Sequence, residues 1–192
     1  MERNIMVAGF GGQGVMVIGK LLSNAICDST DKNVTFFPSY GAEQRGGTAN
    51  CYVVISDEPV GSPASDIVDD LLIMNGPSLN KFLGKLKPGG TLFINSTIVK
   101  DAVSRDDITT VPAPVTEMAL ELGNPKVLNV IMLGVYIGYA GILSEELMLD
   151  TILGQLGKKA ALLELNKTAF AKGLEIGRAA ASVSGGRKIY GH

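Results

Sequence analysis

Short apolar segments alternate with longer segments of helical periodicity along most of the chain. Short continuous apolar runs are typical of strands that are buried on both faces of a sheet. They predict strands over residues 4–9, 33–38, 51–56, 70–75, 91–95 and 108–112. Apolar positions three and four residues apart predict helices over 13–29, 77–86, 114–123, 127–143, 145–156 and 160–182. The alternation favours an α/β fold with an open, mostly parallel sheet, flanking helices and a helical C-terminal segment.

The domain organisation follows from the same pattern. No repeat or linker divides the chain, so we expect a single domain over residues 1–182 and a flexible, glycine-rich tail over 183–192. The segment 127–144 carries no charge, and its length is at the lower limit for a membrane-spanning helix. Within it, Gly134 and Gly138 share one helix face and favour close approach of another backbone. We therefore predict a core or subunit-interface helix, and we expect this segment or the helices beside it to contact a partner chain.

The first predicted strand runs into a glycine-rich loop, GFGGQGV at residues 9–15. Gly9, Gly11 and Gly14 match G-x-G-x-x-G between a strand and a helix, where unpaired amides at the helix start bind phosphate. A nicotinamide dinucleotide site would add an acidic residue near the end of the second strand, but residues 36–40 read FFPSY. An ATP loop would need G-x-x-x-x-G-K-[ST], which the sequence lacks. Both absences weigh against these ligands, and the alternative is that the glycines serve only close strand–helix packing.

A second motif, PSYGAEQRGGTANC at residues 38–51, follows the second predicted strand. Ligands bind at the carboxyl edge of strands in open α/β sheets. Arg45 precedes the paired glycines Gly46 and Gly47, and its guanidinium is able to clamp a carboxylate or phosphate, or to pair with an acid of a partner chain. The alternative is a solvated loop with turn glycines, but the position beside the glycine-rich loop favours a function.

Composition argues against several classes of function. The net charge is −2 over 192 residues and no basic stripe is present, so we expect no nucleic-acid binding. The only histidine is His192, and Cys27 and Cys51 do not have the spacing of metal ligands. We therefore expect no iron–sulfur or zinc site and no histidine-assisted nucleophile in this chain. Two unpaired thiols, with no sign of a secretory signal, favour the cytoplasm.

Three stretches together resemble a known family: GFGGQGV at 9–15, PSYGAEQRGGTANC at 38–51 and VVISDEPVGSP at 53–63. Their order and spacing are similar to those of the gamma subunit of 2-oxoacid:ferredoxin oxidoreductases, which is also the gamma domain of single-chain pyruvate:ferredoxin oxidoreductases. The resemblance runs from the start of the chain to about residue 180. It implies a Rossmann-like domain that packs against sister subunits and has no activity alone.

The resemblance also implies a complex that oxidatively decarboxylates a 2-oxoacid to an acyl-coenzyme A and passes electrons to ferredoxin. It implies that thiamine diphosphate, magnesium and iron–sulfur clusters belong to alpha and beta subunits, with a delta subunit as a further candidate, and that this chain helps to hold coenzyme A. The expected coenzyme A contacts are Gly11, Gly12, Gln13 and Gly14. The residues expected at subunit contacts or at the mouth of the active site are Glu43, Gln44, Arg45, Gly46, Gly47, Thr48 and Asn50.

The identity of the 2-oxoacid is a narrower question. The pyruvate type often reads GRGGQG and carries a common proline in the later motif, where this chain has Phe10 and Ala42. The chain therefore looks more like the 2-oxoglutarate or branched-chain type, and we favour 2-oxoglutarate. Two alternatives from other classes stay open: a stand-alone nucleotide-binding regulatory module and an atypical NAD(P)-dependent reductase. Both alternatives predict a monomer that binds a nucleotide by itself. The resemblance to the gamma subunit instead predicts stable association with partners that bind iron–sulfur clusters and thiamine diphosphate.

Overall fold

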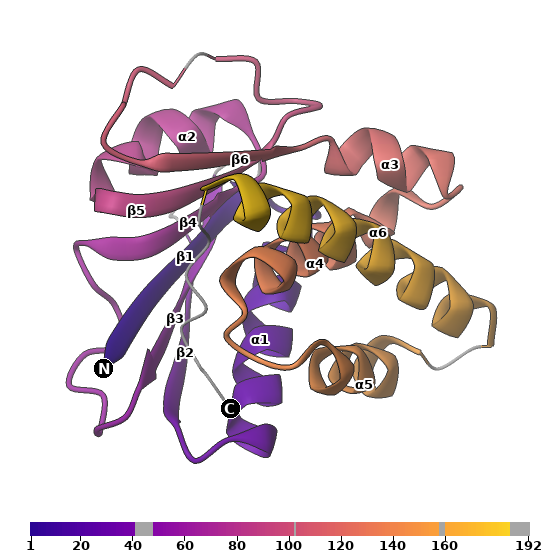
Figure 1. The fold of residues 1–192 in the computed structure, drawn as a ribbon, viewed down its shortest axis with the longest axis horizontal. Helices are drawn as coiled ribbons and strands as arrows, with labels where there is room; N and C mark the ends of the chain where they lie inside the picture. Colours follow the sequence, from indigo (N-terminus) through magenta and orange to yellow (C-terminus); the bar gives the residue numbers. More distant parts are fainter. Residues whose placement is uncertain (41–47, 102, 158–159, 185–192) are drawn as a thin grey trace.

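The computed structural model describes residues 1–40, 48–101, 103–157 and 160–184 (Figure 1). These residues form a sheet whose strand order is β2-β3-β1-β4-β5-β6. The strands are β1 (Glu2–Phe10), β2 (Asn33–Tyr40), β3 (Thr48–Ser56), β4 (Val68–Ile73), β5 (Leu86–Asn95) and β6 (Thr109–Ala113). The helices are α1 (Val15–Ser29), α2 (Gly76–Phe82), α3 (Val115–Glu121), α4 (Leu128–Ala140), α5 (Glu145–Leu156) and α6 (Ala160–Ser184), with 3-10 turns η1 (Leu83–Lys85) and η2 (Pro125–Val127). Every strand and helix expected from the apolar pattern is present, and the α/β prediction is confirmed.

The sheet is mostly parallel. β1, β4, β5 and β6 run in the same direction as neighbours, whereas β3 is antiparallel to both strands that flank it, β1 and β2. β1 and β2 therefore point the same way but are not neighbours, because β3 lies between them. The sequence predicts β1, α1, β2 and β3 as elements, but it does not predict that β3 lies between β1 and β2.

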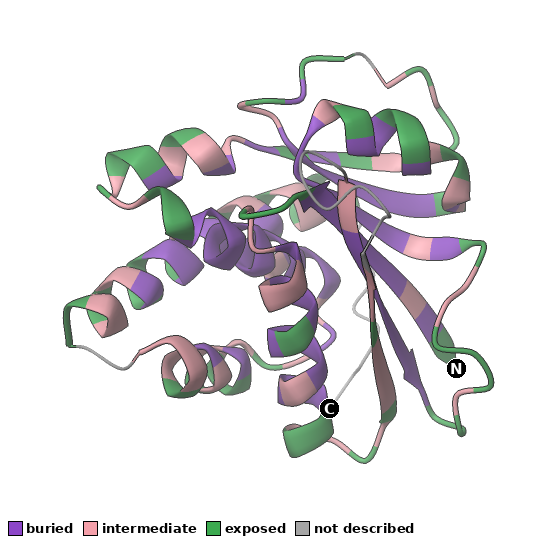
Figure 2. Ribbon diagram, turned by 180° about the vertical axis from the view of Figure 1, so that it is seen from behind, coloured by how far each residue is buried: buried purple, intermediate pink, exposed green. Residues whose placement is uncertain are grey.

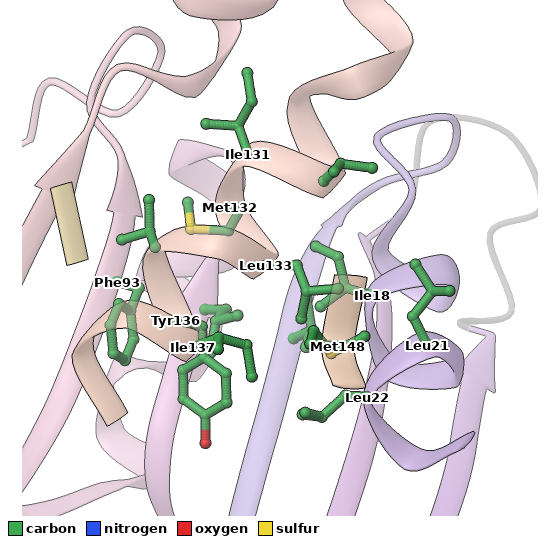
Figure 3. Close-up of a cluster of buried hydrophobic side chains, with 14 of the residues drawn as sticks. Ile18, Leu21, Leu22, Phe93, Ile131, Met132, Leu133, Tyr136, Ile137 and Met148 are labelled. Atoms are coloured by element: carbon green, nitrogen blue, oxygen red, sulfur yellow. The ribbon is translucent and has the colours of Figure 1, made fainter. Parts of the chain in front are cut away.

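Helices cover the two faces of the sheet unequally (Figures 1 and 2). One core cluster packs alternate strand residues such as Val7, Leu72 and Phe93 against α1, α4, α5 and α6. Figure 3 shows side chains of this cluster meeting from helices and sheet. On the other face, intervening residues such as Met6 and Leu71 pack against α2. Both faces of the central strands are therefore buried, which is why their sequences read as continuous apolar runs.

The uncharged segment forms α4, a core helix packed against α6. Its glycines lie against those of α6: a Cβ on Gly134 would approach the carbonyl oxygen of Phe170 to 2.5 Å, and a Cβ on Gly173 would approach that of Ile131 to 2.1 Å. The backbone that α4 approaches is therefore in the same chain, and the core alternative is confirmed. Contact of this region with a partner chain stays a prediction. Among the helices of the described residues, none combines the length and apolar character that a membrane crossing requires.

The C-terminal boundary differs slightly from expectation. Val183 and Ser184 belong to α6, so the helix continues two residues past the predicted end of the domain. The remainder of the expected tail, 185–192, lies outside the described residues. The prediction of a single domain over residues 1–182 stays a prediction.

Candidate functional site

The glycine-rich loop leaves the carboxyl end of β1 and leads directly into α1. The amide of Gln13 donates to the carbonyl oxygen of Phe10 at 3.2 Å, which closes a tight turn. Gly12 has a φ of 92°, and Gly14, which precedes the first helical residue, has a φ of 72°. Side chains are disfavoured at such positive φ values, so these two positions call for glycine whatever the loop binds.

The side chain of Gln13 fastens this loop to the neighbouring strand. Its Oε1 accepts hydrogen bonds from the amide of Phe10 at 2.7 Å and from Nδ2 of Asn75 at 3.4 Å. Its Nε2 donates to the carbonyl oxygen of Met74, just beyond β4, at 3.0 Å. In the structure the Gln13 side chain supports the loop itself, and its expected contact with coenzyme A stays a prediction.

Two asparagines at the ends of β4 and β5 complete this support. Asn75 is fully buried, and its Oδ1 accepts from the amide of Ser78 at 2.8 Å, which caps α2. Asn95 is also fully buried, and its Nδ2 donates to the Met74 carbonyl at 3.4 Å and to Oγ1 of Thr116 at 2.8 Å. Sequence reasoning missed both residues, although an asparagine that ends an apolar strand before a turn is a recognisable signal.

The first turn of α1 has backbone amides without a hydrogen-bond acceptor among the described residues. The helical ladder begins where Ile18 donates to the carbonyl of Gly14 at 3.0 Å. The amides before it, on Val15, Met16 and Val17, have no protein acceptor in the described parts of the chain. Gly14 supplies no side-chain cap, and the first turn carries no acidic residue. These N–H groups and the positive end of the helix dipole favour a phosphate or carboxylate.

The glycines of the loop divide into two kinds. A Cβ added to Gly14 would lie 2.4 Å from Nδ2 of Asn129 in α4, and a Cβ on Gly9 would lie 2.7 Å from Cβ of Met74. These two positions serve close packing. Gly11 and Gly12 are exposed, and a Cβ at either would meet no atom within 4 Å. The open side of the loop therefore belongs to Gly11 and Gly12.

The second motif flanks the same edge of the sheet. Thr48 begins β3 opposite Phe10, the last residue of β1, and its Oγ1 accepts from Nζ of Lys81 at 3.3 Å. Asn50 is nearly buried and pairs with Ala8 of β1. The described start of β3, where the 41–47 connection ends, therefore lies beside the glycine-rich loop, whereas Tyr40 pairs with Ala49 on the far side of β3. The expected site residues Glu43, Gln44, Arg45, Gly46 and Gly47 lie outside the described residues.

The two cysteines lie in different environments. Cys27 is exposed, whereas Cys51 is buried in β3, and burial raises the pKa of the Cys51 thiol to about 12. Within the described ranges, no group of three or more histidine, cysteine, aspartate or glutamate side chains is placed to hold a metal ion.

Known proteins match this chain over nearly its whole length. Residues 4–176 match the family described as pyruvate ferredoxin/flavodoxin oxidoreductase. Ketoisovalerate oxidoreductase subunit VorA of Methanothermobacter marburgensis is 40% identical over 167 residues, which cover 86% of this chain and 34% of VorA. The 2-oxoglutarate synthase subunit KorC of Methanocaldococcus jannaschii is 34% identical over 180 residues, which cover 93% of this chain and 95% of KorC. The chain thus spans about a third of VorA but nearly all of KorC.

Solved structures agree with the sequence matches. The gamma subunit of a keto/oxoacid ferredoxin oxidoreductase from Geobacter sulfurreducens superimposes with a TM-score of 0.84 at 29% identity, covering 94% of this chain and 98% of that one. A 2-oxoglutarate:ferredoxin oxidoreductase from Magnetococcus marinus, with 2-oxoglutarate, coenzyme A and succinyl-CoA bound, also gives 0.84, at 25% identity over 93% of this chain and 31% of that one. From these matches, the chain belongs to the pyruvate ferredoxin/flavodoxin oxidoreductase family.

Proposed function

We propose that this chain is the gamma subunit of a 2-oxoacid:ferredoxin oxidoreductase. The observation that carries the proposal is the nearly complete mutual coverage with KorC and with the Geobacter sulfurreducens gamma subunit. The complex would oxidise and decarboxylate a 2-oxoacid, transfer the acyl group to coenzyme A and pass the electrons to ferredoxin. This chain contributes to subunit packing and to coenzyme A binding and has no activity alone.

The proposed partners are alpha and beta subunits, with a delta subunit as a further candidate, and ferredoxin reached through the complex. Thiamine diphosphate, magnesium and the iron–sulfur clusters are assigned to those partners. The names of the relatives as subunits support an assembly of this kind. The two free cysteines fit a reducing compartment, so we assign the complex to the cytoplasm.

For coenzyme A, we propose that a phosphate group binds at the glycine-rich loop. The unpaired amides at the start of α1 and the open space over Gly11 and Gly12 support this placement. Gln13 and Gly14 then shape the loop, because the Gln13 side chain is hydrogen-bonded to neighbouring strands and Gly14 packs on Asn129. Thr48 and Asn50 line the adjacent edge, where the 41–47 segment is assigned to subunit contacts or to the mouth of the active site.

For the 2-oxoacid, we propose 2-oxoglutarate or a branched-chain 2-oxoacid and favour 2-oxoglutarate. Relatives with both names are more than 30% identical to this chain. Comparing the turnover of 2-oxoglutarate, ketoisovalerate and pyruvate by the purified complex tests the choice. Turnover of pyruvate alone would contradict it.

Co-purification tests the assembly. A tagged copy produced in the source cells should bring down partner chains that carry thiamine diphosphate and iron–sulfur clusters, in constant proportion through gel filtration. A tagged chain that elutes as a monomer and binds a nucleotide by itself would instead support the regulatory or NAD(P)-dependent alternative.

A matched pair of variants tests the loop. Gly11→Asp adds a negative charge where nothing crowds the new side chain, and Gly11→Asn adds the same shape without charge. In the assembled complex, Gly11→Asp should raise the dissociation constant of coenzyme A about tenfold, the equivalent of roughly 1.4 kcal/mol of repulsion, while Gly11→Asn stays close to wild type. Calorimetric titration measures binding without turnover. Equal affinity in both variants would remove the loop from the coenzyme A site.

A further inference from the structure

A polar pocket of about 210 Å³ lies at the opposite edge of the sheet from the glycine-rich loop. It opens between the amino-terminal parts of β1, β4, β5 and β6 and the ends of α4 and α6. Its side chains include Arg3, Asp69, Asp70, Lys87, Thr91 and Thr109. Arg3 and Phe10 are seven residues apart on β1, so the pocket is about 23 Å from the loop.

A buried ion pair forms the floor of this pocket. Arg3 is 8% exposed and Asp70 is 1% exposed. Nε of Arg3 donates to Oδ2 of Asp70 at 2.5 Å, and Nη2 donates to Oδ1 at 2.9 Å. Tyr136 of α4 donates its hydroxyl to Oδ2 at 2.9 Å, and Figure 3 shows that hydroxyl pointing away from the apolar cluster. Burial raises the pKa of Tyr136 well above its ordinary range, so the phenol stays a donor.

Asp70 occupies only one of the two forked faces of the Arg3 guanidinium. A guanidinium has five N–H groups, and the Nε–Nη2 side uses two of them here. Beyond Asp70, the guanidinium interacts with the Tyr136 hydroxyl, and among the described residues Nη1 forms no hydrogen bond. Two parallel N–H groups of a guanidinium match the two oxygens of a planar carboxylate.

The rest of the pocket adds further hydrogen-bond donors. Each oxygen of Asp69 already has one partner, because Oδ1 pairs with Nζ of Lys87 and Oδ2 accepts from the amide of Asn4 at 2.7 Å. The ammonium of Lys87 is about one third exposed and keeps further N–H groups. Thr91 and Thr109 add hydroxyl groups. Both carboxylates of the pocket are therefore paired with a cation, and both cations keep N–H groups beyond these pairs.

We propose that this pocket binds a small carboxylate. The carboxylate lies on the Nη1 side of Arg3, beside Lys87 and the two threonine hydroxyls. The pocket is smaller than the pockets of about 300 Å³ or more that hold drug-sized ligands, so we assign it a small carboxylate. The site is independent of the coenzyme A proposal, because it uses none of the residues of the glycine-rich loop.

An NMR titration of the full chain with propionate tests the proposal. Propionate at millimolar concentration should shift the amide signals of Thr91 and Thr109 and leave those of Gly11 and Gly12 in place. Sulfate, which is tetrahedral, should bind more weakly. If propionate shifts none of these signals, or if sulfate binds equally well, the carboxylate site does not exist as proposed.

Two lysine variants provide a matched comparison. Substitution of Arg3 would leave Asp70 buried without its partner and endanger folding, so Lys87 is the better target. Lys87→Met removes a lysine paired with Asp69 in the pocket, and Lys85→Met removes a similarly exposed lysine paired with Asp66 outside it. Lys87→Met should weaken propionate binding roughly tenfold, and Lys85→Met should leave it unchanged. Equal affinity in the two variants would overturn the assignment of Lys87.

Discussion

The two edges of the sheet are held together by different chemistry. At the carboxyl edge, neutral side-chain amides join the ends of β1, β4 and β5. Gln13 and Asn95 both donate to the carbonyl oxygen of Met74, and Asn75 donates to Gln13. At the amino edge, a buried charge pair between Arg3 and Asp70 joins β1 to β4. Helix α4 contacts both edges, through Asn129 at one and Tyr136 at the other.

The difference suits an anion site at the carboxyl edge. Neutral amides satisfy buried polar groups without adding charge, so they leave the positive potential at the start of α1 intact. A carboxylate in the same support would repel a phosphate. At the amino edge each charged side chain is paired with one of opposite charge, Arg3 with Asp70 and Lys87 with Asp69. Removing one member of a buried pair leaves the other without its partner.

The largest expected effect comes from breaking the charge pair. Asp70→Ala leaves the Arg3 guanidinium buried without its partner and should lower the free energy of unfolding by about 3–5 kcal/mol. Replacing the whole group, as Arg3→Met with Asp70→Leu and Tyr136→Phe, should recover most of that loss, because no buried polar group is then left unpaired. Urea unfolding of the two variants measures the difference. If Asp70→Ala costs less than about 1 kcal/mol, the amino edge is not held by this pair.

A smaller effect is expected from glycines of the loop. Gly14→Ala should cost about 2–3 kcal/mol, because it combines a positive φ with a contact of 2.4–2.8 Å to Asn129. Gly11→Ala has neither constraint and should change stability by less than about 0.5 kcal/mol. Thermal unfolding of both variants separates the two kinds of glycine. Similar losses in both would contradict the division between packing and open positions.

The hydrogen bonds of the carboxyl edge should contribute less to the free energy of unfolding than the ion pair of the amino edge. Gln13→Leu keeps the side-chain volume but removes the hydrogen bonds to Phe10 and Met74, and it should cost about 1 kcal/mol since the site is only partly buried. Hydrogen exchange at the amides of the loop should accelerate more than exchange in β5. A loss as large as that of Asp70→Ala would show that the two edges do not differ as described.

Most of the fold could be predicted from the sequence, because the spacing of apolar residues distinguishes each helix from each strand. The complete order of the strands in the sheet could not be predicted. β3 is buried on both faces like its parallel neighbours, so its apolar run carries no sign of direction or of its place between β1 and β2.

The candidate site was readable only in part. The glycine spacing located the loop, but the inward position of Gln13 depends on Met74 and Asn75, about sixty residues away in the chain. The pairing of Arg3 with Asp70 spans a similar distance. A charged residue at the start of each apolar strand was the available signal, and such a residue is ordinarily exposed.

The smallest expected effect is a difference in the rate at which a reagent modifies the two cysteine thiols. In the wild-type protein at pH 8, a thiol reagent should modify Cys27 quickly and Cys51 only on opening, since Cys51 is buried and its pKa is raised to about 12. Cys51 pairs with Val7 at the middle of β1, so its labelling rate reports on both edges. Asp70→Ala should accelerate Cys51 labelling more than Gln13→Leu does. Rapid labelling of Cys51 in the wild type would contradict its protected position.

β1 is synthesised before both strands that flank it, β3 and β4. Until residues 48–56 and 68–73 leave the ribosome, its apolar residues and both rows of backbone hydrogen-bonding groups lack their final partners. A strand of this kind is prone to pair with other nascent chains while it waits. We therefore expect the yield of folded protein to depend on how quickly translation reaches β3 and β4.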